Sequence, residues 1–169
     1  MRELKYRLKK RLDGAEKIAV LGIGSYLRGD DAAGMLAAEE IKKICGKKSG
    51  GPKIGVFFGE TAPENLTGEI KKFKPTHLLI IDAADIGKRS GSVSILCAKN
   101  IAGATFSTHR LPVKLIADYL SCSISCDTIV LGIHPESFAF GKLPSQKIKK
   151  AAKELSQILE EVICISLKI

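Results

Sequence analysis

The chain has 169 residues, of which 45% are hydrophobic, and this length and composition fit one domain with a single hydrophobic core. Its 27 Lys and Arg against 18 Asp and Glu give a formal net charge of +9, which raises the question of an anionic partner. The basic residues lie in lysine-rich amphipathic segments without the set of interleaved aromatic residues that stacks on bases. The pattern therefore argues against nucleic acid and favours a solvated basic surface.

The five cysteines are scattered and odd in number, without the close pairs of a zinc site or a thioredoxin motif, so we expect reduced thiols. The N-terminus lacks the apolar core of a signal peptide, and no apolar run approaches the ~18 residues of a membrane span. We expect a cytoplasmic protein with no membrane insertion.

The first third of the chain alternates helix, strand and helix. Residues 1–16 form a basic N-terminal extension in which Arg2 to Arg11 are expected to be helical, within a single domain that spans residues 1–169. Lys17 to Ile23 (KIAVLGI) is short, apolar and stopped by glycine, which predicts a buried strand. Apolar residues recur at helical spacing from Asp31 to Cys45, and this pattern predicts a helix.

The remaining two thirds continue the alternation, and His77 to Asp85 (HLLIIDAAD) is the clearest strand because it is apolar on both faces. Further strands are predicted at Lys53 to Phe58, at Ser90 to Ala98 as an antiparallel edge, and at Asp127 to Ile133. Further helices are predicted from Pro63 to about Lys72, after Pro112, and from Ser145 to Val162. Together they predict an α/β fold, a three-layer α/β/α sandwich with a mostly parallel (mixed) twisted sheet of about five strands.

The loop after the first strand, GIGSYLRGDDAAG, has the outline of a phosphate loop but not its chemistry. Gly24 and Gly29 keep the glycine spacing, yet Asp30 and Asp31 replace the lysine and hydroxyl that would bind phosphate. Two carboxylates at a helix start repel a polyphosphate, so nucleotide binding is disfavoured. Either acid can cap the following helix, and one can do so while the other projects into a cleft.

Two further polar residues are predicted at the same edge of the sheet as Asp31, because ligands gather at the carboxyl ends of parallel strands. Asp82 ends the central strand, where it is either a turn-forming residue or part of a site. His109 lies in the loop FSTHRLP, where it is either a surface residue or a third ligand. Taken together, Asp31, Asp82 and His109 would suit a borderline divalent metal such as nickel or zinc.

In chain order, the segments LGIGSYLRGDDAAG, TAPENL, KPTHLLIIDAADIGKRSGSV, THRLPVKLIADYL and IVLGIHPE resemble the NiFe-hydrogenase maturation endopeptidases of the HycI type. The resemblance runs from about Lys17 to Leu159. It implies an endopeptidase that removes a C-terminal extension from the hydrogenase large-subunit precursor after nickel insertion. It also implies that Asp31, Asp82 and His109 bind metal. The nickel would be carried by the substrate, with zinc or another divalent ion as the alternative.

The resemblance also suggests roles in catalysis and in substrate binding. Asp31 or Asp82 would serve as the base that activates water. Gly59, Glu60 and Thr61 would contact the tail of the substrate, although relatives carry a glycine where this chain has Glu60. His77 and His134 are left out of the predicted site, because relatives have other polar residues there.

Alternative functions remain open on the sequence alone. The chain could be a nickel- or zinc-binding chaperone that holds the immature hydrogenase without cutting it. It could also be a small-molecule hydrolase or nucleotide-binding module, although it lacks the G-x-S-x-G motif of common serine hydrolases. The basic extension is either a solvated helix or a docking element for the large subunit. We expect a monomer, since gripping one client needs no second copy.

Overall fold

A computed structural model describes residues 2–44, 51–96 and 113–165 of the chain. Helices and strands alternate along the chain, as expected. The strands are β1 (Lys17–Ile23), β2 (Lys53–Glu60), β3 (His77–Ala83), β4 (Val93–Leu96) and β5 (Asp127–Ile133). The α-helices are α1 (Arg2–Arg11), α2 (Ala33–Ile44), α3 (Thr67–Phe73), α5 (Val113–Ile124) and α6 (Gln146–Ile165), with short 3-10 helices η1 (Gly29–Ala32) and η2 (Pro63–Leu66).

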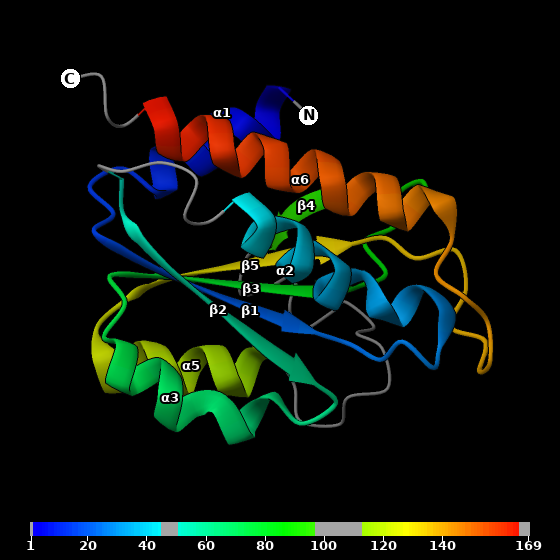
Figure 1. The fold of residues 1–169 in the computed structure, drawn as a ribbon, viewed down its shortest axis with the longest axis horizontal. Helices are drawn as coiled ribbons and strands as arrows, with labels where there is room; N and C mark the ends of the chain where they lie inside the picture. Colours follow the sequence, from blue (N-terminus) through cyan, green and yellow to red (C-terminus); the bar gives the residue numbers. More distant parts are fainter. Residues whose placement is uncertain (1, 45–50, 97–112, 166–169) are drawn as a thin grey trace.

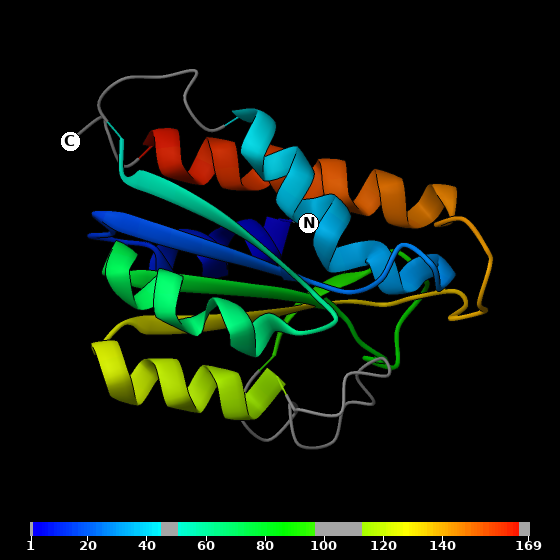
Figure 2. The ribbon, with the colours of Figure 1, turned by 60° about the horizontal axis from the view of Figure 1, so that its bottom comes forward.

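The strands form one mixed sheet between two layers of helices (Figures 1 and 2). The strand order is β2-β1-β3-β5-β4, in which all neighbours are parallel except β4, which runs antiparallel to β5. Helices α1, α2 and α6 cover one face, and α3 and α5 cover the other. The predicted three-layer α/β/α sandwich and its antiparallel edge strand are confirmed.

Each face of the sheet has its own hydrophobic core because side chains alternate along a strand. On β3, Leu79, Ile81 and Ala83 belong to the core under α1, α2 and α6. Leu78 and Ile80 belong to the core under α3 and α5. A strand buried on both faces reads as a continuous apolar run, which is why this strand was the clearest in the sequence.

The element boundaries differ from the prediction mainly at 3-10 turns. The helix expected from Asp31 begins as the 3-10 turn η1 and becomes α-helical only at Ala33, and the helix expected at Pro63 is likewise split into η2 and α3. Strand β2 is two residues longer than predicted, and β3 ends two residues earlier. Cys97, Ala98 and the loop that leads to Pro112 lie outside the described residues. Within the described ranges, no helix is long and apolar enough to cross a membrane.

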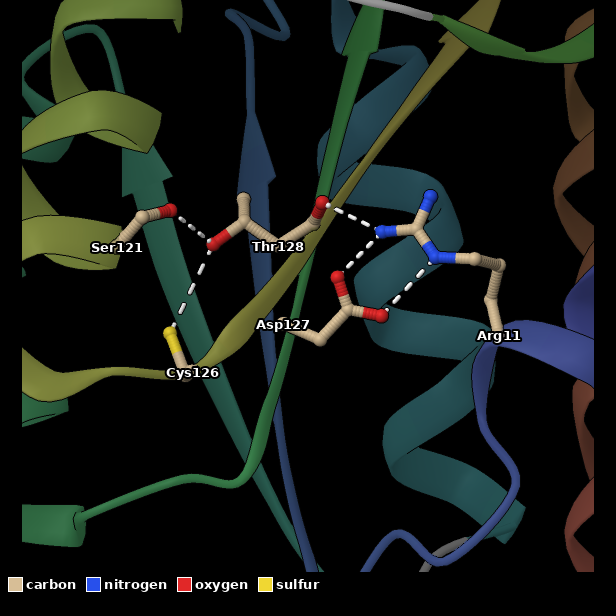
Figure 3. Close-up of polar contacts among 5 residues, drawn as sticks. All are labelled: Arg11, Ser121, Cys126, Asp127 and Thr128. Atoms are coloured by element: carbon tan, nitrogen blue, oxygen red, sulfur yellow. Dashed lines mark hydrogen bonds and ion pairs between the residues drawn. The ribbon is translucent and has the colours of Figure 1, made fainter.

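Helix α1 is an integral part of the core despite its many basic residues. Leu4, Leu8 and Leu12 recur every four residues and are buried against the layer that contains α6. The helix ends in a bidentate ion pair, in which Arg11 donates to both carboxylate oxygens of Asp127, with Nε at 2.9 Å from Oδ2 (Figure 3). The hydrogen bond with Asp127 is the main cause of a raised pKa of Arg11.

We predict that Leu8→Ala lowers the free energy of unfolding by about 2–5 kcal/mol, because Leu8 is fully buried. Chemical denaturation of the two proteins measures this difference. The matched control is Tyr6→Ala on the same helix, where the residue is 70% exposed and the change in the free energy of unfolding should stay within about 0.5 kcal/mol. Equal effects of the two substitutions would show that α1 does not contribute to the core.

Candidate active site

The acidic loop after β1 folds back over the carboxyl end of the sheet and buries Asp31 completely. Asp31 lies in η1, which contacts β3, and its side chain is 0% exposed. Its Oδ2 accepts a hydrogen bond from the backbone N–H of Ser25 at 3.0 Å. The carboxylate is thus held by its own loop and shielded from solvent.

Two glycines make this position of Asp31 possible. Gly24 has a φ of +135°, and a β-carbon there would overlap the carbonyl oxygen of Asp31. Gly34, at the start of α2, lies against the backbone of Ile23 and Ile81, and a β-carbon would overlap both carbonyl oxygens. These glycines serve close packing of the loop and helix rather than an approach to phosphate.

Asp82 reaches the same edge of the sheet from β3. It directly follows Ile81, which contacts Gly34, and it pairs in register with Gly132 of β5. Its side chain is 0% exposed, and Oδ1 accepts the backbone N–H of Ala83 at 2.7 Å. The structure thus brings Asp31 and Asp82, the two predicted acids, to adjacent elements in a buried environment where electrostatic interactions are strong.

Asp30 has a different role from Asp31, although both are buried. Its carboxylate accepts hydrogen bonds from the backbone N–H of Glu136 at 2.7 Å and of Ser145 at 2.6 Å, and from the Ser145 hydroxyl at 3.1 Å. These donors lie on the loop between β5 and α6. Asp30 therefore joins two loops rather than capping the helix that follows it.

The predicted substrate-binding residues Gly59, Glu60 and Thr61 line a pocket of about 200 Å³ at the carboxyl end of β2. The Glu60 carbonyl accepts the N–H of Gly24 at 2.9 Å, so the pocket adjoins the acidic loop. Glu60 has a φ of +46°, a region that favours glycine. The pKa of Tyr26 is raised, mainly because the residue is partly buried. Its hydrogen bond to Glu39 and the negative charges of Glu39 and Glu60 raise this pKa further.

The histidines have separate positions. His109, the third predicted ligand, lies outside the described residues. Within the described ranges, no group of three or more His, Cys, Asp or Glu could hold a metal ion. His77 lies at the amino end of β3, away from the acids, and contacts Thr76. Nδ1 of His134 accepts the N–H of Ile86 at 3.2 Å and also lies 3.4 Å from Oδ1 of Asp85.

Comparison with known proteins gives a consistent result. Residues 35–162 match the family model HycI, described as hydrogenase maturation protease. The hydrogenase 3 maturation protease of Escherichia coli K12 is 36% identical over 142 residues, which cover 83% of this chain and 87% of the relative. A candidate hydrogenase maturation protease of Methanocaldococcus jannaschii is 34% identical over 163 residues, which cover 95% of this chain and 96% of the relative.

The crystal structure of the HycI protease from Thermococcus kodakarensis superposes with a TM-score of 0.82 at 30% identity, and covers 94% of this chain and 99% of that structure. This chain belongs to the hydrogenase maturation protease family. It is therefore a peptidase with the α/β fold of the HycI proteases, and it acts in hydrogenase maturation.

The sequence interpretation of this hydrogenase maturation protease missed the role of Asp30, which links the acidic loop to the β5–α6 loop. Asp30 was considered only as a helix cap or a cleft residue, and its partners on the β5–α6 loop were not identified. Glu136 and Ser145 are separated from it by 106 and 115 residues, so no local spacing pattern could reveal these bonds. Glu136 lies in IVLGIHPE, a segment that carries part of the resemblance, but nothing in that segment indicates a contact with Asp30.

We predict that Asp30→Ala lowers the free energy of unfolding by about 1–3 kcal/mol, because it leaves partly buried donors of Glu136 and Ser145 without an acceptor. Hydrogen exchange should also accelerate at these two amides. Asp13→Ala, at an exposed position, is the control and should change stability by less than about 0.5 kcal/mol. Unchanged exchange at both amides in Asp30→Ala would contradict the proposed link between the loops.

Proposed function

We propose that this protease removes a C-terminal extension from the large-subunit precursor of a NiFe-hydrogenase after nickel has entered the precursor. The observation that carries the proposal is the pair of buried carboxylates, Asp31 and Asp82, on adjacent elements at the carboxyl edge of the sheet. Membership of the hydrogenase maturation proteases supports the client class.

Asp31 and Asp82, together with His109, are proposed to recognise nickel that the precursor already holds. Carboxylate oxygen and imidazole nitrogen are donors that a borderline ion such as nickel accepts. The metal is then part of the substrate, and zinc or another divalent ion could be recognised in its place. Because both carboxylates are shielded from solvent, the residues that cover them must move before a client can reach them.

Hydrolysis needs a base for the attacking water, and one of the two carboxylates is the proposed base. Water adds to the scissile carbonyl carbon while the carboxylate takes its proton, and the proton then passes to the departing amine as the C–N bond breaks. The pocket at Gly59, Glu60 and Thr61 lies beside the acidic loop, which suits it to hold the tail that is removed.

The decisive experiment incubates the purified chain with nickel-loaded and nickel-free precursor and follows precursor mass over time. We expect loss of a C-terminal peptide from the loaded form only. If a loaded precursor binds and keeps its mass, the protein is an assembly chaperone that holds the precursor without cutting it. Equal cutting of both forms would reject nickel recognition but keep the peptidase.

We predict that Asp31→Asn reduces the rate of precursor shortening by about 10²–10⁴-fold, because the neutral amide can neither act as a base nor supply the anionic oxygen proposed to recognise nickel. The substitution preserves side-chain shape, so the melting temperature should change little. Asp85→Asn is the matched control, an exposed acid near the end of the same sheet edge, and it should process at the wild-type rate. Full processing by Asp31→Asn would eliminate the assigned role.

A further inference from the structure

Strand β2 departs from regular pairing at its carboxyl end, beside the end of β1 (Figure 1). Gly22 pairs with Phe58, but the next residue, Ile23, pairs with Glu60, so Gly59 is an extra residue in β2. Such a bulge turns the following side chain in a new direction. Glu60 also has a φ of +46°, a left-handed conformation that few residues other than glycine adopt. Because such residues concentrate at sites that hold ligands, Glu60 is a candidate for contact with a substrate.

Glu60 gives the pocket at this end of β2 its negative charge. The pocket has a volume of about 200 Å³, and Glu60 is the one ionisable residue among the described residues that line it. The side chain is exposed, so its charge is accessible to a ligand. The other lining residues are uncharged: Phe58, Gly59, Thr61, Ala62, Asn65 and Leu66.

The carboxylate of Glu60 has no partner within the described part of the chain, where it forms neither an ion pair nor a side-chain hydrogen bond. Lys42 of α2 reaches the neighbouring residue instead, with its Nζ 5.2 Å from the centroid of the Phe58 ring. The negative charge of the pocket is therefore not neutralised by a described cation.

The pocket is connected to the loop of Asp31 through the backbone of one residue. The N–H of Gly24 donates to the carbonyl of Glu60 at 2.9 Å, and a β-carbon on Gly24 would overlap the carbonyl oxygen of Asp31. The pKa of Tyr26, in the same loop, is raised mainly by burial and to a smaller extent by charges that include Glu60. A peptide bond held at Asp31 therefore has neighbouring residues of the peptide near this pocket.

The chemistry of the pocket selects a basic side chain. Lysine and arginine combine an apolar stem with a cationic end. Ala62 and Leu66 supply apolar atoms against which the stem can pack, and Glu60 supplies the opposite charge. An acidic side chain would be repelled, and an uncharged side chain would leave Glu60 without a partner.

We propose that Glu60 recognises a lysine or arginine side chain in the C-terminal extension that the protease removes. This inference rests on the proposed function for the identity of the precursor. The contact is made by the extension and not by nickel, so it is the same in loaded and nickel-free precursor. Glu60 thus determines specificity for the sequence of the extension.

The test measures the binding of two synthetic peptides, one with the sequence of the precursor's C-terminal extension and one with its lysines and arginines replaced by glutamine. We expect the wild-type chain to bind the natural peptide about three- to tenfold more tightly, with a preference that weakens as salt is added. In Glu60→Gln the preference should disappear. Glu60→Lys should instead prefer a third peptide, which carries glutamate at the same positions. With nickel-loaded precursor, Glu60→Gln should raise KM by a similar factor and leave kcat unchanged.

Two control variants separate recognition from folding. Glu60→Gly removes the carboxylate at a backbone conformation that glycine favours, so the peptide preference should be lost while the melting temperature is retained or raised. Glu64→Gln removes an exposed carboxylate of η2 that does not line the pocket, and the peptide preference should stay at its wild-type value.

The outcomes separate this inference from the proposed function. A charge preference that depends on Glu60, with a precursor that is never shortened, supports the cation site and rejects the protease step. Equal binding of the natural and glutamine peptides, or an unchanged preference in Glu60→Gln, overturns the cation site whether or not the precursor is cut. An extension without lysine or arginine, or a wild-type chain that binds neither peptide, overturns it as well.

Discussion

The start of helix α2 lies directly on the ends of β1 and β3, and the position of the acidic site depends on this contact. Gly34 is in contact with the backbone of both strands, and any side chain there would force the helix away. Asp31 precedes this contact by one helical turn, and Asp82 follows the contacted residue Ile81. Because Gly34 has no side chain, α2 can approach β1 and β3 closely, and this approach brings Asp31 and Asp82 to the same edge of the sheet.

The adjacent acids Asp30 and Asp31 are both buried, but they are hydrogen-bonded to different parts of the chain. Burial of a carboxylate is unfavourable unless hydrogen bonds replace the lost water. Asp30 accepts hydrogen bonds from donors on the β5–α6 loop. These bonds offset the free-energy cost of burying its carboxylate and also hold the two loops together. Asp31 receives a donor from within its own loop. The two residues are alike in the sequence, but the donors of Asp30 lie on a distant loop, whereas Ser25 lies in the same loop as Asp31.

The sequence predicts what depends on local pattern and misses what depends on distant contacts. The strand at His77–Ala83 and the placement of Asp82 follow from an apolar run stopped by an acid. The spacing of Leu4 and Leu8 indicates a buried face on α1, whereas the basic composition of this segment predicted only a solvated helix or a docking element. Asp30 could not be assigned, because a short polar side chain gives no indication of a partner more than a hundred residues away.

Burial of Asp31 and Asp82 has a consequence for selectivity under the proposed function. Contacts that are the same for nickel-loaded and nickel-free precursor supply affinity to both, and binding energy that is equal for both forms cannot discriminate between them. In that proposal, discrimination depends on Asp31 and Asp82, because a metal carried by the precursor would change the charge that two buried carboxylates face. Charge has a stronger effect at such a position than at the surface, since little water is present to screen it.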